Sequence, residues 1–337
     1  MKTSPPQAIK TQVISGSEAG FFCGFLSPRG NQSARIGIKL NGFCETQFRL
    51  GVARLASNPY SMLNLSSRVL LPAIVVLPLL LSCKKSLYTA LKSEVDNVVE
   101  TLPAVHTPVS AYINESTGGY YEALPSRYDS SNKKYPMILF LHGIGELGNG
   151  SSDLPKMLRA GLPRLINRKK FPPSFEVGGE NLSFIVISPQ FKKRPDNEQV
   201  NSVLKYMVSK YRVDTSRIYV TGLSLGGGIT WEYASQYGNS IAAAVPICGG
   251  SWPDPKRAGR IATANLPVWA FHNADDKVVP VSYTRDYVNI INANHPSVKA
   301  KYTIWATGGH DSWTKAYDPE FREQGKNMYE WMLSYKR

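Results

Sequence analysis

The stretch that decides the fold is Arg217-Ile-Tyr-Val-Thr-Gly-Leu-Ser-Leu-Gly226, in which an apolar run leads directly into a Gly-x-Ser-x-Gly pentapeptide. The apolar run predicts a buried strand, and the residues that follow predict a helix over Gly226–Tyr237. A strand, a sharp turn and a helix in this order hold the hydroxyl of Ser224 above the edge of a sheet. Because a neighbouring imidazole would make that hydroxyl reactive, we predict that Ser224 is a nucleophile. The alternative is an ordinary serine in a glycine-rich turn.

Three histidines follow Ser224, and their order along the chain selects one of them as the general base. In folds built on this turn, the acid comes after the serine and the histidine after the acid. His272 lies in a predicted strand ahead of any suitable acid, and His295 precedes a proline at the end of a polar helix. His310 follows the last predicted strand on a Gly-Gly loop. We therefore predict that His310 is the base.

Two adjacent carboxylates, Asp275 and Asp276, follow the predicted strand Val268–His272. A carboxylate at this place would fix the tautomer of the imidazole and stabilise the imidazolium. We prefer Asp276, because it stands directly before the Lys-Val-Val-Pro turn, and Asp275 remains the alternative. Asp311 lies beside the histidine and is predicted to cap the helix that follows.

A second glycine-rich turn follows the predicted strand Met137–His142, within Leu139-Phe-Leu-His-Gly-Ile-Gly-Glu146. A backbone N–H in such a turn can bind the negatively charged oxygen of a tetrahedral intermediate. We predict that Ile144 supplies this donor, with Gly145 as the alternative. Leu225, the residue after the nucleophile, is predicted to supply the second donor. The histidine of this motif is interpreted as structural.

Short apolar runs alternate with amphipathic stretches from about residue 109 onward, a pattern that predicts an α/β fold. Several runs are continuously apolar, as in parallel strands that are covered on both faces. We expect a mostly parallel eight-stranded sheet with helices on both faces, and a long excursion over 144–180 that borders the site. The expected strands are Val109–Asn114, Gly119–Leu124, Met137–His142, Phe184–Ser188, Ile218–Thr221, Ala242–Cys248, Val268–His272 and Lys301–Ala306. The expected helices follow the capping box Asp196–Gln199 and lie at Gly226–Tyr237, Ser282–Ala293 and Asp318–Tyr335.

The apolar run 69–82 is too short to cross a bilayer as a helix, and it contains two prolines. A basic residue before it and small residues at its end are typical of a secretory signal that starts at Met62. The alternative is a buried core segment with an ordinary cysteine. The resulting division of the chain is 1–61, an upstream extension that is disordered or absent from the mature protein; 62–82, a signal peptide; 83–108, a linker; and 109–337, the catalytic domain.

Composition excludes several other classes of protein. The net charge of +14 is spread over short Lys/Arg pairs without a nucleic-acid-binding motif, so we expect no nucleic-acid partner. The four cysteines have the spacing of neither a disulfide scaffold nor a zinc site. The predicted chemistry requires no metal and no organic cofactor.

Four motifs together resemble the α/β-hydrolase esterases, in particular the dienelactone-hydrolase-like, prolyl-oligopeptidase-like and feruloyl/acetylxylan esterase group. They are Leu-His-Gly-Ile-Gly-Glu, the segment from Val213 through the pentapeptide, Asp-Lys-Val-Val-Pro and Gly-Gly-His-Asp-Ser-Trp. The resemblance implies a catalytic triad of Ser224, Asp276 and His310. The sequence departs from the group at Asn273, where glycine is usual, and it carries serine where dienelactone hydrolases proper use cysteine.

The ending Leu-Leu-Ser-Cys83 resembles the lipobox of bacterial lipoproteins. That resemblance implies lipidation at Cys83, contact with a membrane through the lipid anchor only, and a cell-envelope location.

The function expected from these observations is that of a serine carboxylic-ester hydrolase that forms an acyl-enzyme. Trp231, Trp252 and Trp313 stand near the predicted site, where they either pack in the core or stack on carbohydrate-linked acyl or phenolic esters. The alternatives are a peptidase or acyltransferase of the same fold, and a catalytically inactive binding lipoprotein.

Overall fold

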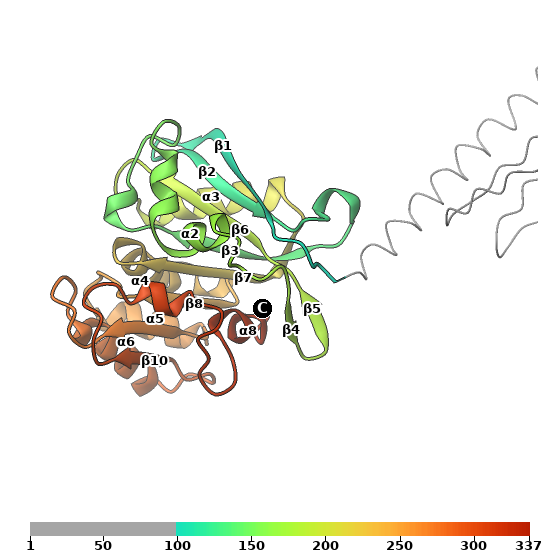
Figure 1. Cartoon of the computed structure of the whole chain (residues 1–337). Coiled ribbons are helices and arrows are strands. Elements are labelled where there is room, and N and C mark those ends of the chain that lie inside the picture. Colours follow the sequence, from blue (N-terminus) through green and yellow to red (C-terminus); the bar gives the residue numbers. More distant parts are fainter. Residues whose placement is uncertain (1–98) are drawn as a thin grey trace, which may run out of the picture. The chain divides into compact units, whose positions relative to one another are not determined.

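One sheet of eight strands organises the molecule, in the order β1-β2-β6-β3-β7-β8-β9-β10 (Figure 1). The computed structural model describes residues 99–337. The predictions on 1–61, on 62–82 and on the first part of 83–108, Cys83 included, lie outside the described residues. The strands of the sheet are β1 (Val105–Asn114), β2 (Thr117–Leu124), β3 (Tyr135–Leu141), β6 (Ile185–Phe191), β7 (Val213–Leu223), β8 (Ala243–Ile247), β9 (Trp269–Asn273) and β10 (Lys301–Trp305).

The direction of the strands confirms the expected fold class. β1 pairs with β2, and β2 with β6, in antiparallel fashion. All neighbours from β6 through β3, β7, β8 and β9 to β10 are parallel. Because the carboxyl ends of parallel strands meet at one edge of a sheet, residues that follow β3, β7, β8 and β9 come together there.

Helices cover both faces of the sheet. They are α2 (Gly161–Asn167), α3 (Asn197–Lys210), α4 (Leu225–Tyr237), α5 (Pro255–Thr263), α6 (Val281–Ala293), α7 (Trp313–Ala316) and α8 (Met328–Leu333). Side chains of α3, α4, α5 and α6 belong to one hydrophobic cluster, and those of α2, α7 and α8 belong to the other. A short hairpin of β4 (Phe175–Val177) and β5 (Glu180–Leu182) forms an arm beside α8 (Figure 1).

Strand β3 shows how the sequence produces two cores. All seven of its residues are buried. Met137, Leu139 and Leu141 belong to the first cluster, whereas Ile138 and Phe140 belong to the second. Successive side chains of a strand point to opposite faces, so a continuous apolar run is what a strand between two helical layers requires.

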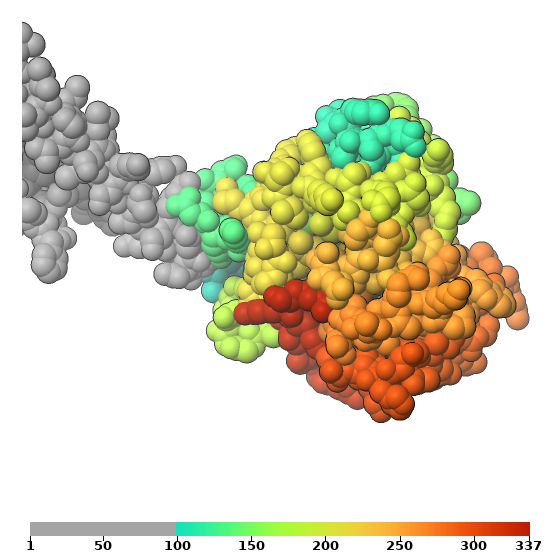
Figure 2. Space-filling model, turned by 180° about the vertical axis from the view of Figure 1, so that it is seen from behind, coloured from blue at the N-terminus to red at the C-terminus, as the bar shows by residue number. Residues whose placement is uncertain are grey.

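The outside of the molecule follows the strand order. In the view from behind, the colours run from the first strands through the middle of the chain to its C-terminal part (Figure 2).

Helix α3 begins at the predicted capping box, where the carboxylate of Asp196 accepts the Gln199 N–H at 2.8 Å. Over residues 99–337, none of the helices is long and apolar enough to cross a bilayer.

Two expectations about elements need correction, and several short elements were not expected. The helix expected over Asp318–Tyr335 is confined to Met328–Leu333, because Pro319 and a Gly325 with φ of 79° interrupt it. Strand β1 begins at Val105, so part of the expected linker belongs to the sheet. Helix α5 was not expected, and the excursion over 144–180 contains α2 and the β4–β5 hairpin.

Candidate active site

The turn between β7 and α4 holds Ser224 in a strained conformation. Its φ of 53° and ψ of −113° are rare for a residue with a side chain. The Ser224 N–H donates to the carbonyl of Ile247 at 2.9 Å, which ties the turn to β8. A Cβ atom at Gly226 would lie 2.0 Å from the carbonyl oxygen of Leu141, so only glycine lets α4 start this close to β3. The turn therefore presents the hydroxyl at the carboxyl edge of the sheet.

Two hydrogen bonds connect this hydroxyl to a carboxylate through one imidazole. His310 Nε2 lies 2.8 Å from Ser224 Oγ, and His310 Nδ1 lies 2.7 Å from Asp276 Oδ2. In this arrangement Nδ1–H donates to the carboxylate, which leaves Nε2 free to accept from the hydroxyl. The Asp276 side chain is fully buried, and the side chain of His310 is 19% exposed. The structure thus brings together the three side chains that the sequence selected.

The surroundings of Asp276 keep its carboxylate charged. Burial acts to raise the pKa of Asp276, but hydrogen bonds from His310 and from the N–H groups of Val279 and Val278 hold it below its ordinary value. Those two N–H groups donate to Oδ1 at 3.0 and 2.8 Å. His272 Nε2 lies 3.1 Å from Oδ2, so a second histidine supports the same oxygen.

Asp275 has a different place from Asp276. Its carboxylate accepts the N–H groups of Gly309 at 2.8 Å and Gly308 at 3.3 Å. The Asn273 side-chain amide donates to the carbonyl of Gly309 at 3.0 Å. Both side chains therefore hold the loop that carries the histidine. The asparagine that departs from the usual glycine thus has a contact of its own.

The two predicted donor residues each begin a helical segment. Leu225 is the first residue of α4, and Ile144 is the first residue of the 3-10 turn Ile144–Glu146. The first N–H groups of a helix have no partner within it. A Cβ atom at Gly143 would lie 3.8 Å from Ser224 Cβ, so this turn lies against the nucleophile. The side chain of Ile144 is 69% exposed, and a role for this residue at the site would belong to its backbone.

His142 and Glu146 hold the turn that contains Ile144. His142 is buried; its Nε2 accepts the Phe191 N–H at 3.0 Å, and its Nδ1–H donates to the Gly143 carbonyl at 2.7 Å. Burial lowers the pKa of His142 to about 4, so the ring is neutral, as a structural role requires. The carboxylate of Glu146 lies against Gly143; burial raises the pKa of Glu146, whereas the Gly143 N–H acts to lower it. Sequence reasoning gave Glu146 no role, although its carboxylate stands within the glycine-rich turn.

Cys248 is a further residue at the site that its sequence context did not indicate. It is fully buried, and its sulfur lies within 4.8 Å of potential ligand atoms of Asp276 and His310. Burial raises the pKa of the Cys248 thiol to about 12, so the sulfur is a neutral thiol. Because both imidazole nitrogens already have partners, these three residues are poorly suited to hold a metal ion.

One of the three tryptophans considered in the sequence touches the site. Trp231 is fully buried and stacks on Tyr287 with ring centroids 4.3 Å apart. Trp252 is 67% exposed and packs edge-on against another aromatic ring. The ring of Trp313 meets the ring of His310 edge-on at 5.3 Å.

A mostly parallel sheet of this order, with a serine on a strained strand–helix turn beside an imidazole, defines a serine hydrolase of the α/β-hydrolase class. Residues 128–318 match the sequence model of the phospholipase/carboxylesterase family. The chain belongs to this family.

Individual relatives agree with the class. The bifunctional acetylxylan esterase/xylanase XynS20E of Neocallimastix patriciarum is 26% identical over 144 residues, which are 43% of this chain and 20% of that protein. The Salmonella typhi protein named "Putative carboxymethylenebutenolidase" is 28% identical over 258 residues, which cover 68% of this chain and 91% of the relative. A solved thermostable esterase matches with a TM-score of 0.51 and 26% identity, covering 69% of this chain and 63% of that one. The protein is therefore an esterase-type hydrolase.

Proposed function

We propose that the protein hydrolyses carboxylic esters through a triad of Ser224, His310 and Asp276 and an acyl-enzyme intermediate. The observation that carries the proposal is the pair of hydrogen bonds, 2.8 and 2.7 Å long, that joins Oγ to the imidazole and the imidazole to the buried carboxylate. For substrates we propose carbohydrate-linked acyl or phenolic esters. The similarity to the acetylxylan esterase/xylanase and the position of Trp313 beside the imidazole support this class.

In the first half of the reaction, Ser224 Oγ attacks the acyl carbon while His310 Nε2 takes the hydroxyl proton. The imidazolium that forms is stabilised by the carboxylate of Asp276. Negative charge develops on the carbonyl oxygen, and we assign the N–H groups of Ile144 and Leu225 to bind it. The imidazolium then gives its proton to the departing alcohol, and Ser224 carries the acyl group as an ester.

In the second half, water takes the place of the alcohol. His310 Nε2 accepts a proton from the water as its oxygen attacks the acyl carbon, and the same two N–H groups bind the oxyanion. The proton then returns to Oγ as the acid leaves. Each proton is moved by a side chain of the site, so this cycle uses no metal or organic cofactor.

The test combines an active-site label with turnover on the full-length protein. A fluorophosphonate probe is expected to label the wild type, which is also expected to hydrolyse p-nitrophenyl acetate. Ser224→Ala should lose the label and roughly 10⁴-fold or more in kcat. Ser209→Ala, on the exposed surface of α3, is the matched control and should behave like the wild type.

Three outcomes would separate the alternatives. A binding protein without activity would show neither label nor turnover, and Ser224→Ala would equal the wild type in both assays. A peptidase would cleave p-nitroanilide peptides in preference to esters, and an acyltransferase would pass the acyl group to an added alcohol in preference to water.

A further inference from the structure

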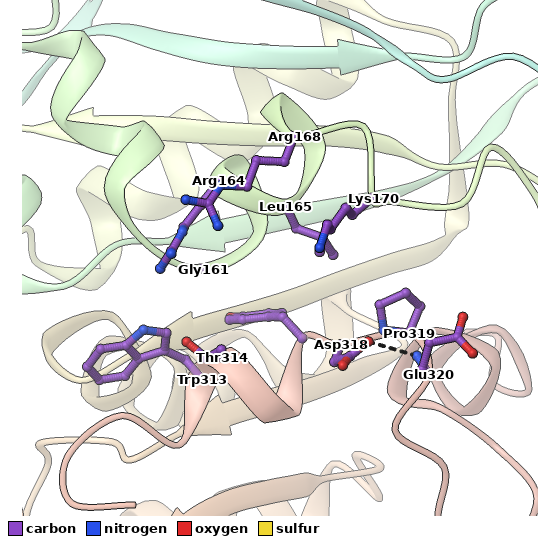
Figure 3. Close-up of a pocket in the computed structure, with 11 residues that line it drawn as sticks. Gly161, Arg164, Leu165, Arg168, Lys170, Trp313, Thr314, Asp318, Pro319 and Glu320 are labelled. Carbon is purple, nitrogen blue, oxygen red and sulfur yellow. Dashed lines mark hydrogen bonds between the residues drawn. The ribbon is translucent and has the colours of Figure 1, made fainter.

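A cavity of about 470 Å³ lies between α2 and the segment that begins with α7 (Figure 3). Its size lies in the range of small-molecule sites. Trp313 lines the cavity and contacts the ring of His310. On the opposite wall, Gly161 lies against Leu223, the residue before the nucleophile, as a Cβ atom there would be 2.8 Å from the Leu223 side chain. Through Trp313 and Gly161 the cavity therefore adjoins residues that border the proposed triad, although none of the three triad side chains lines it.

Three cations line the wall formed by α2 and the residues after it: Arg164, Arg168 and Lys170. Over residues 99–337, no ion pair and no side-chain hydrogen bond involves any of the three. Other arginines of the described chain, such as Arg217 and Arg322, pair with carboxylates at 3.0 and 2.6 Å. The cations of this cavity are thus available to a ligand.

The two ends of the cavity differ in charge. Arg164 lies above Trp313, whereas Lys170 lies above Asp318 and Glu320 at the other end (Figure 3). The carboxylate of Asp318 accepts the Glu320 N–H at 3.0 Å, which fixes an acidic group at the end away from His310. An anionic ligand group is therefore favoured at the end where arginine and the indole ring face each other, close to the triad.

We propose, on the basis of the proposed esterase function, that this cavity binds a ring that carries a carboxylate and belongs to the ester substrate. The face of Trp313 offers stacking for an aromatic or sugar ring. The planar guanidinium groups of Arg164 and Arg168 match the geometry of a carboxylate and bind it through charge-assisted hydrogen bonds. The preferred substrate is an ester in which either the acid or the alcohol part bears this charge.

The test uses two matched pairs of esters with the full-length protein. 4-Acetoxybenzoate and 4-acetoxybenzamide differ only in the charge of the alcohol part, and monomethyl terephthalate and methyl 4-carbamoylbenzoate differ only in the charge of the acid part. We expect kcat/KM to favour the carboxylate over its amide by about tenfold or more in at least one pair. The pair that shows the preference identifies the part of the ester that occupies the cavity.

Substitutions then assign the preference to the cavity. Arg164→Gln and Arg168→Gln should each reduce the carboxylate-to-amide ratio, by up to about tenfold. The matched control Lys169→Gln removes the same charge from an exposed residue that does not line the cavity, and it should keep the wild-type ratio. Equal rates on both members of both pairs, or equal ratios in Arg164→Gln and the wild type, would overturn the proposal.

A binding measurement separates this proposal from the proposed function. Calorimetry with benzoate should show binding to Ser224→Ala and weaker binding when Arg164→Gln is added. If benzoate binds in this way but no ester is hydrolysed, the anionic subsite stands and the esterase proposal fails. If p-nitrophenyl acetate is hydrolysed but benzoate does not bind, the esterase proposal stands and the subsite fails.

Discussion

At the scale of single residues, the carboxylate of Asp276 has the most crowded environment in the site. It accepts from the N–H groups of Val278 and Val279 on one oxygen and contacts His310 and His272 on the other. Every one of these partners points a hydrogen at the carboxylate, so the side chain has to be an acceptor at both oxygens. Such an arrangement orients the imidazole of His310 and favours its positive charge during the reaction.

The neighbouring aspartates provide a direct comparison. Asp276→Asn places an NH2 group where an acceptor is required, so we expect kcat to fall by on the order of 10⁴-fold, the size of effect seen when a triad acid becomes an amide. Asp275→Asn keeps one acceptor oxygen for the loop of Gly308 and Gly309, and we expect a loss of less than about tenfold. Steady-state kinetics on p-nitrophenyl acetate measure the loss of kcat in each of the two variants. Equal losses in the two variants would mean that the loop, and not the charge on Asp276, limits the reaction.

At the scale of elements, the close approach of α4 to β3 and β7 positions the nucleophile. A Cβ atom at Gly226 would meet the carbonyl oxygens of Leu141 and His142 at 2.0 and 2.7 Å. Both contacts are with backbone atoms, which cannot move away as the end of a flexible side chain can. The helix would have to shift away from the sheet, and Ser224 at its N-terminus would shift with it.

We therefore expect Gly226→Ala to lower the free energy of unfolding by about 3 kcal/mol and to reduce ester hydrolysis. The matched control is Gly259→Ala in α5, where the nearest atom to the added Cβ lies at 3.8 Å. That change should raise the free energy of unfolding by about 0.5–1 kcal/mol, because alanine loses less conformational entropy in a helix. Urea unfolding of both variants measures the two effects. A Gly226→Ala protein as stable as the wild type would contradict the packing argument.

The elements that the sequence predicted well are those whose pattern is set by burial. Continuous apolar runs predicted β3 and its neighbours, because both faces of these strands are covered. Strand β1 is half exposed at the edge of the sheet, so its apolar pattern was weak at its start. The three-residue strands β4 and β5 are too short to give a pattern at all.

The sequence likewise predicted one part of the candidate site and not another. Chain order and loop chemistry were enough to select Ser224 and His310. The choice between Asp275 and Asp276 depends on which carboxylate faces inward after β9, and adjacent residues in a turn carry no periodicity that reveals this. Cys248 reaches the site only because β8 lies beside β7 in the sheet, which is a property of the tertiary structure.

At the scale of the whole molecule, the prediction that Cys83 carries a lipid concerns how the folded part is held at a membrane. With the full-length protein expressed in a bacterium, we expect it to fractionate with the membrane, and Cys83→Ala should release it to the soluble fraction. A fatty acid adds about 0.8 kcal/mol of membrane affinity per buried CH2 group. Removing the lipid should therefore lower the membrane affinity enough to change the fraction in which the protein is found. Cys44→Ala is the matched control and should remain with the membrane. A mature chain that starts before Met62, measured by intact mass, would contradict the predicted processing.

The pH dependence of stability also belongs to the whole molecule, because unfolding exposes His142 to water. In the folded protein its pKa is lowered to about 4 by burial, against about 6.5 when exposed. Both ring nitrogens are committed to the backbone, since Nε2 accepts from Phe191 and Nδ1–H donates to Gly143. A proton on Nε2 would point at the Phe191 N–H, so the folded state resists protonation.

The sign of the effect follows from this difference in pKa. Between pH 6.5 and 4 the unfolded chain binds a proton at His142 that the folded chain does not, so acidification stabilises the unfolded state. The neutral state of His142 in the fold contributes about 3 kcal/mol to the free energy of unfolding. This contribution is complete above pH 6.5 and is lost as the pH falls toward 4. His142→Asn keeps a donor for the Gly143 carbonyl but cannot titrate. When urea unfolding is measured from pH 7.5 to 4.5, the free energy of unfolding should therefore decline less in His142→Asn than in the wild type. If the free energies of the two proteins fall in parallel, His142 is protonated in the folded protein as readily as in the unfolded chain.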